Sequence, residues 1–145
     1  MSKHRYFELS EFIVSSTAKK KGIDNTPSFE VVEHLDELVE KILDPLRAAY
    51  GMAIIVSSGF RCLLLNKAVG GVPDSVHILG WAADLQVRGS FRKFVEFVVE
   101  WFRKTGTKFD QLIVESDAKG NKWLHIGLYD NYGRQRGQIL NVEKN

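Results

Sequence analysis

Apolar residues recur at helical spacing in several stretches of the chain, and the first two predict helices near its start. Residues 9–20 predict a short helix that ends at Gly22, and Ser28 is a suitable N-cap for a longer one. The apolar face of this longer helix consists of Val31, Leu35, Leu38, Val39, Ile42 and Leu46. Pro45 cannot donate a hydrogen bond to the carbonyl of Lys41, so we expect a kink or a break there.

Two further helices are predicted later in the chain. Residues 63–69 predict a short helix before the glycines at positions 70 and 71, and Ser90 can cap a third long helix. The buried stripe expected on that helix consists of Phe91, Phe94, Val95, Val98, Trp101 and Phe102. The order of elements is thus helices first, then a mixed region, then strands.

Four stretches predict β-strands, and in the last three the side chains can be assigned to faces of a sheet. The stretches are residues 52–56, which predict a buried strand, 82–87, 110–115 and 123–128. Because successive side chains of a strand point to opposite faces, one apolar set faces the core. This set consists of Ala83, Leu85, Val87, Leu112, Val114, Leu124, Ile126 and Leu128. Asp84, His125 and Glu115 consequently fall on the other face of their strands.

The last two strands are joined by residues 117–121, Asp-Ala-Lys-Gly-Asn, which supply the turn of a hairpin. If Glu115 lies opposite Trp123 in this hairpin, Glu115 and His125 share one face. A shift of the register by one residue would put them on opposite faces.

Length and composition are typical of one globular domain. The chain has 145 residues, of which 44% are hydrophobic, and this is enough for a core without disulfides. We expect a single domain over residues 1–145, helical over about 1–50 and carrying the motifs over about 51–145. Cys62 is the only cysteine, which excludes an intrachain disulfide and a cysteine-rich zinc site.

Charge and hydropathy argue against two classes of partner. The formal net charge is +2, and the 20 basic residues are scattered among 18 acidic ones, so we expect no nucleic-acid binding. No stretch approaches the ~18 apolar residues of a membrane span. The basic start is followed by Glu8 and Glu11 instead of the apolar stretch of a signal peptide. We therefore expect no export signal and synthesis in the cytoplasm.

Three polar residues in the second half of the chain are of the types that ligate zinc: His77, Asp84 and His125. Two imidazoles and one carboxylate leave one coordination position open, as in catalytic zinc sites. Asp84 stands among apolar neighbours and needs a partner or a cation if it is buried. A single histidine is more often exposed or hydrogen-bonded, and we expect this of His4 and His34.

These residues form motifs that resemble a known family. Residues 75–84 fit the pattern SxHxxGxAxD, and Trp123 and His125 supply a later WxH. Both resemble the zinc D-alanyl-D-alanine carboxypeptidase family, whose relatives include vancomycin-resistance dipeptidases, phage L-alanyl-D-glutamate endolysins and, more distantly, the hedgehog signalling domain. The upstream residues 57–61, Ser-Ser-Gly-Phe-Arg, are similar to the SGYR segment of that family. The resemblance covers the chain from roughly residue 50 to its end and implies an α+β fold, with a small antiparallel sheet packed on helices.

The resemblance also implies roles for individual residues. His77, Asp84 and His125 become the ligands of one zinc ion. Arg61 becomes the group that meets a substrate carboxylate or a developing oxyanion, and its charged, bidentate guanidinium suits either task.

The general base departs from the family pattern. Many relatives carry an acid three residues before the last histidine ligand, and this chain has Lys122 there. Glu115 is the best replacement, because the strand pattern puts it on the face of His125; it would take a proton from the zinc-activated water. Gln111 is expected to orient the substrate, and Ser75 to hydrogen-bond a neighbour of the ligands.

The function that the resemblance implies is a zinc peptidase acting on peptidoglycan stem peptides. Carboxypeptidase, dipeptidase and endopeptidase action all stay open, and residues 129–137 either line one end of the groove or form a solvated turn. A small domain without an export signal suits a phage- or prophage-type lysin that reaches the cell wall when released. Two alternatives are a zinc-bearing binding module and a structural protein with a vestigial site. Oligomeric state and the role of the first helix are left open.

Overall fold

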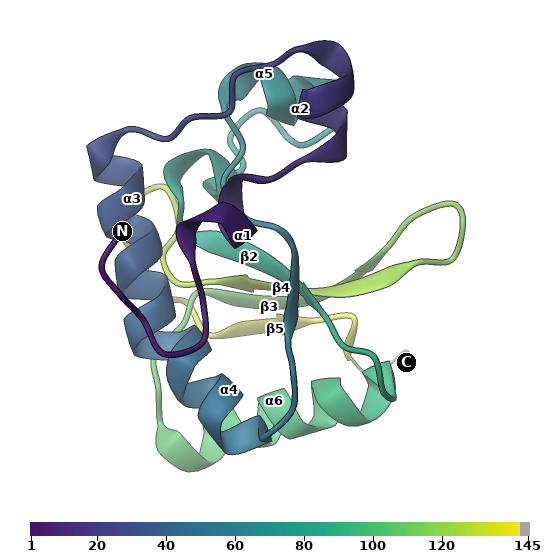
Figure 1. The fold of residues 1–145 in the computed structure, drawn as a ribbon. Coiled ribbons are helices and arrows are strands. Elements are labelled where there is room, and N and C mark those ends of the chain that lie inside the picture. Colours follow the sequence, from purple (N-terminus) through teal and green to yellow (C-terminus); the bar gives the residue numbers. More distant parts are fainter. Residues whose placement is uncertain (143–145) are drawn as a thin grey trace.

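A mixed five-stranded sheet forms the centre of the fold over residues 1–142, the part of the chain that this computed structural model describes (Figure 1). The order across the sheet is β1-β2-β4-β3-β5. The strands are β1 (Ile55–Ser58), β2 (Ala82–Gln86), β3 (Gln111–Ser116), β4 (Lys122–Gly127) and β5 (Gln138–Leu140). The first four are antiparallel neighbours, and β5 is parallel to β3. The predicted α+β class is confirmed, with β5 added at one edge.

Helices precede the sheet and are inserted between its strands. They are α1 (Leu9–Ile13), α2 (Ser16–Lys21), α3 (Phe29–Leu38), the π-helical turn η1 (Val39–Leu43), α4 (Asp44–Tyr50), α5 (Leu63–Ala68), the 3-10 turn η2 (Val76–Leu79) and α6 (Phe91–Thr105). Ser28 and Ser90 cap α3 and α6 as predicted, each accepting a hydrogen bond from a backbone N–H three residues on. No helix among the described residues is long and apolar enough to cross a membrane.

The first predicted helix is divided into two. Val14 has extended backbone angles, and the Ser15 hydroxyl accepts from the N–H of Ala18 at 3.2 Å, so it caps a new helix. A serine side chain competes with the helical backbone in this way. The second helix ends at Gly22 as predicted, in the left-handed conformation.

Pro45 does not break the long helix. The N–H of Asp44 donates to the carbonyl of Val39, five residues back, and the wide π turn leads directly into α4. A π turn is one way in which a helix adjusts to a backbone group without its usual partner, here the Lys41 carbonyl, to which Pro45 cannot donate.

The strand predicted at residues 52–56 was placed too early and was wrongly taken to be buried. β1 begins at Ile55, and Met52 is exposed. Within residues 1–142, β1 is an edge strand that pairs with β2 alone, and a bulge between Val56 and Ser58 shifts the register. The pairing of Ser58 with Asp84 extends the strand beyond the apolar run.

The core lies on one face of the sheet. α3, η1, α4 and α6 pack on this face, and the strand residues that it buries are those expected from strand alternation: Ala83, Leu85, Leu112, Val114, Leu124 and Ile126. The hairpin has the required register, with Glu115 opposite Trp123, and Figure 1 shows it extending beyond the rest of the fold. The opposite face of the sheet is therefore available for polar side chains.

Candidate metal centre

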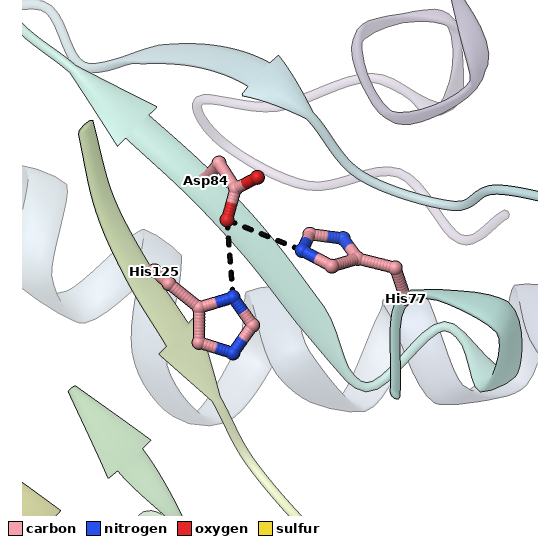
Figure 2. Close-up of side chains that lie close together, drawn as sticks. All are labelled: His77, Asp84 and His125. Atoms are coloured by element: carbon pink, nitrogen blue, oxygen red, sulfur yellow. Dashed lines mark hydrogen bonds and ion pairs between the residues drawn. The ribbon is translucent and has the colours of Figure 1, made fainter. Parts of the chain in front are cut away.

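Two strands and one 3-10 turn bring three candidate ligands together (Figure 2). Asp84 of β2 pairs directly with His125 of β4, and His77 approaches from η2. Oδ1 of Asp84 lies 3.2 Å from Nε2 of His77 and 3.1 Å from Nδ1 of His125. One ligand atom from each residue lies within 4.8 Å of the others. The sequence prediction selected the same three residues.

All three side chains are buried, with exposed fractions of 2% for His77, 5% for Asp84 and 7% for His125. Burial by itself raises the pKa of Asp84. The charge of His77 and the hydrogen bonds from both imidazoles outweigh this and hold the pKa well below its ordinary range. The carboxylate is therefore ionised and available as a ligand.

The surroundings of His77 determine which ring nitrogen can bind a metal. Nδ1 lies 2.6 Å from the carbonyl oxygen of Gly59, which can only accept, so Nδ1 carries the proton. In the neutral ring, the lone pair of Nε2 then faces the acceptor Oδ1 of Asp84. Two facing acceptors need a second proton or a cation between them. Two imidazoles and a carboxylate, with the hydrogen bond from Nδ1 of His77 to the Gly59 carbonyl, fit Zn²⁺.

Helix α3 holds the turn that connects two of the candidate ligands. Nδ1 of His34 lies 2.6 Å from the carbonyl oxygen of Leu79, and the His34 ring stacks on Trp81 with centroids 3.8 Å apart. Gly80, between Leu79 and Trp81 in the chain, has φ +80°, and a Cβ there would lie 2.9 Å from Val31. His34 is hydrogen-bonded as expected, but its place behind the metal centre was not foreseen.

Arg61 lies beside the centre and is tied to Ser75, as its Nη2 donates to the Ser75 hydroxyl at 3.2 Å. Its Nε is buried without a hydrogen-bond partner among residues 1–142. Burial lowers the pKa of Arg61, while the charges of Asp84 and Glu115 oppose this shift. The side chain also lines the groove, where a guanidinium can meet an anionic group of a ligand.

Glu115 lies on the same face as His125 and lines the same groove. Its Oε1 accepts from Nε1 of Trp123 at 2.8 Å, which fixes one side of the carboxylate. Gln111 also lines this groove, and its Nε2 donates to Oε1 of Gln138 at 2.8 Å. Lys122, in the position of the missing acid, begins β4 and is exposed.

The segment of residues 129–137 contributes Asp130, Asn131 and Arg136 to the lining of the groove. Asn131 lines it and donates from Nδ2 to the carbonyl of Asp74 at 2.8 Å. Arg136 makes a bidentate ion pair with Asp110, which is 1% exposed. The sequence prediction did not include this pair, whose members are 26 residues apart.

The groove continues in two directions from the metal centre. One part, which we call the imidazole arm, is lined by Ser75, His77, Gln111, Glu115, His125 and Asn131, among others. The other, the hydroxyl arm, runs between residues 10–17 and residues 54–61 and carries the hydroxyls of Ser10, Ser15, Ser16, Thr17, Ser57 and Ser58. Arg61, Val69, Asp84 and Trp123 line both arms, so the two meet beside the candidate metal centre.

Comparison with known proteins adds one match. A family model described as Peptidase M15 matches residues 5–126, which include all three candidate ligands, Arg61 and Glu115. A search of curated proteins finds no match for the chain.

Proposed function

Because the chain belongs to the Peptidase M15 family, whose members are zinc peptidases, we propose that it hydrolyses peptide bonds of peptidoglycan with one zinc ion at the buried triad. The observation that carries this proposal is the arrangement of His77, Asp84 and His125 on the floor of a groove. The cell-wall substrate rests on the motif resemblance to D-alanyl-D-alanine peptidases and phage endolysins. The setting that we propose is that of a lysin released to the cell wall.

His77 through Nε2, Asp84 through a carboxylate oxygen and His125 through Nδ1 would hold the zinc ion. When bound in such a site, zinc polarises a carbonyl and lowers the pKa of water. The Gly59 carbonyl keeps the proton of His77 on Nδ1, which leaves Nε2 unprotonated for the metal.

Glu115 is the residue that we propose moves the proton. Its Oε1 is held by Trp123, and its Oε2 has no hydrogen-bond partner among the described residues, so Oε2 takes the proton. In hydrolysis the peptide C–N bond breaks, the oxygen of water joins the carbonyl carbon, and Glu115 passes the proton to the leaving nitrogen. Arg61, which lines the groove and carries a guanidinium, stabilises negative charge on the substrate.

Digestion of purified peptidoglycan tests the proposal, with mass spectrometry of the released muropeptides and elemental analysis of the protein. We expect about one zinc per chain and new peptide termini in the digest. Glu115→Gln should lower the rate by about 10²-fold or more while zinc content stays the same. The matched control is Glu100→Gln, a half-buried acid on α6 that does not line the groove and should leave the rate unchanged.

Three results would contradict parts of the proposal. Full zinc occupancy without any cleavage favours a zinc-bearing binding module. Absence of stoichiometric zinc favours a vestigial site. A fully active Glu115→Gln variant refutes the assignment of the base alone, because the triad does not depend on it.

A further inference from the structure

Asn25 is a buried polar residue between α2 and α3 that has no part in the proposed chemistry. It is only 9% exposed. Its Nδ2 donates to the carbonyls of Ile13 at 2.9 Å and Phe60 at 3.0 Å, and its Oδ1 accepts from the N–H of Cys62 at 2.8 Å. Three of the four hydrogen bonds that a primary amide can make are thus spent on backbone groups of distant segments.

The segment that Asn25 holds is residues 59–62, which connect β1 to α5 without helix or strand of their own. The buried backbone groups of such a segment need partners from other parts of the chain. Asn25 supplies them for the Phe60 carbonyl and the Cys62 N–H. The N–H of Phe60 in turn donates to the carbonyl of Phe12 in α1 at 2.7 Å. The segment is therefore fixed by α1 and by Asn25.

The same segment contacts the candidate metal centre at two points. The carbonyl of Gly59 lies 2.6 Å from Nδ1 of His77, and the N–H of Arg61 donates to the backbone carbonyl of His77 at 3.2 Å. These two hydrogen bonds join the segment to both the ring and the backbone of one candidate ligand. Arg61 itself belongs to the segment, and its guanidinium reaches Ser75. A displacement of residues 59–62 would therefore move a zinc ligand and the guanidinium together.

The three partners of Asn25 match the chemistry of an amide. Two of them are carbonyl oxygens, which need donors, and the third is an N–H, which needs an acceptor. An ionised aspartate has the same shape but no donor, so it would place a carboxylate beside two carbonyls. Alanine would leave three backbone groups without their partner, of which the Phe60 carbonyl is fully buried.

We propose that Asn25 is a positioning residue of the metal centre. It holds residues 60–62 in place, and through them it sets the His77 ring for zinc and the Arg61 guanidinium for the substrate. The part that concerns the substrate rests on the proposed peptidase function, whereas the part that concerns zinc can be tested without it. The inference gives the loop after α2, far from the motifs along the chain, a role in the site.

Zinc affinity of the full-length chain, measured by competition with a chelator, tests the first part. Asn25→Asp keeps the shape of the side chain and removes both donors, so the dissociation constant should rise by about tenfold or more. Asn25→Ala introduces no charge and serves as a second variant, with an effect in the same direction. The matched control is Val98→Ala, a fully buried core position of α6 that should lower the urea midpoint but change zinc affinity less than about twofold. Circular dichroism verifies that the variants fold.

A double-mutant cycle with Arg61 tests the second part. At saturating zinc, Asn25→Asp should lower the rate of peptidoglycan digestion by about tenfold, because the guanidinium is misplaced. In a chain that already carries Arg61→Ala, the same change should lower the remaining rate by about threefold or less, since the position of an absent guanidinium has no effect. A merely structural role predicts the same factor in both backgrounds.

Hydrogen exchange of the unsubstituted chain adds a measurement that does not depend on how a variant folds. The N–H of Cys62 should exchange at least about tenfold more slowly than in an unstructured peptide, because Oδ1 of Asn25 accepts from it.

The outcomes separate the two parts of the inference. Unprotected exchange at Cys62, wild-type zinc affinity in Asn25→Asp, or an equal loss of zinc affinity in Val98→Ala overturns the role of Asn25 at the metal centre. Equal factors in both Arg61 backgrounds overturn its role through the guanidinium. If the wild-type chain digests no peptidoglycan, the proposed function fails, and zinc affinity still decides whether Asn25 positions His77.

Discussion

His34 offers a direct test of how the fold supports the metal centre, because it contacts the turn between two ligands without being a ligand itself. Replacing it by alanine removes the hydrogen bond to the Leu79 carbonyl and the stacking on Trp81. A partly buried hydrogen bond contributes about 1 kcal/mol, and an aromatic pair contributes about 1 kcal/mol more. We therefore expect His34→Ala to lower the free energy of unfolding by about 2 kcal/mol.

The same substitution should weaken zinc binding. The turn of η2 and Gly80 places His77 relative to Asp84, and loss of its anchor lets these residues spread in the metal-free protein. Partners outside the ligand set are typically worth about 10–100-fold in metal affinity. Competition with a chelator measures the dissociation constant, and urea denaturation of the metal-free chain measures stability.

Two variants sharpen the interpretation. His34→Phe keeps a ring on Trp81 but lacks the donor, so it should fall between wild type and His34→Ala in both measurements. His4→Ala removes a histidine whose Nε2 lies 2.7 Å from Asp36, far along the chain from the ligands. It should lower stability without changing zinc affinity. If His34→Ala leaves zinc affinity unchanged, or His4→Ala weakens it equally, the anchoring role of His34 is refuted.

Three further predictions concern the supports of the site. Gly59→Ala should cost about 2 kcal/mol in urea denaturation, because the new Cβ would lie 2.7 Å from the Phe12 backbone, whereas Gly89→Ala, with open space around it, should change little. Asp110→Asn should cost about 2 kcal/mol by removing the buried charge of the bidentate pair and leaving Arg136 only its 3.7 Å contact with Asp130, against less than about 0.5 kcal/mol for Glu100→Gln on the surface; equal losses would contradict the importance of burial. In the chelated chain, the pKa of Asp84 is lowered on folding, so ionised Asp84 stabilises the fold fully above its ordinary pKa of 3.8, and this stabilisation is lost as pH falls further. The difference in unfolding free energy between wild type and Asp84→Asn should thus shrink below about pH 4, and a constant difference would contradict the ion pairing.

Features set by local alternation could be predicted from the sequence. The faces of β2, β3 and β4 follow from side chains that alternate along each strand, and this placed Asp84 and His125 on one face before any pairing was known. The caps Ser28 and Ser90 follow from hydrogen bonds within four residues. These rules connect residues only a few positions apart, so they can be recognised in the sequence alone.

Features set by contacts between distant segments could not be predicted. The bond between His34 and Leu79 spans 45 residues, and nothing near either residue signals it. β5 exists because its backbone pairs with β3 after a loop, in a stretch with little strand character. The apolar run at residues 52–56 looked like a buried strand because periodicity alone does not distinguish an edge strand from a central one. The hydroxyl arm, too, emerges only when α1 and α2 pack beside β1.

The π turn η1 has a consequence for how this chain can change in length. A π turn accommodates one residue more than an α-helical turn, and α3, η1 and α4 nevertheless present Leu38, Ile42 and Leu46 to one core. Removal of one residue from Val39–Leu43 would wind the turn into α-helix and rotate α4 by about 100° relative to α3. Leu46 would then leave the core. The extra residue of the π turn is therefore needed to keep Leu46 in its place. Insertions and deletions in related chains should therefore fall outside η1, in the exposed hairpin between β3 and β4.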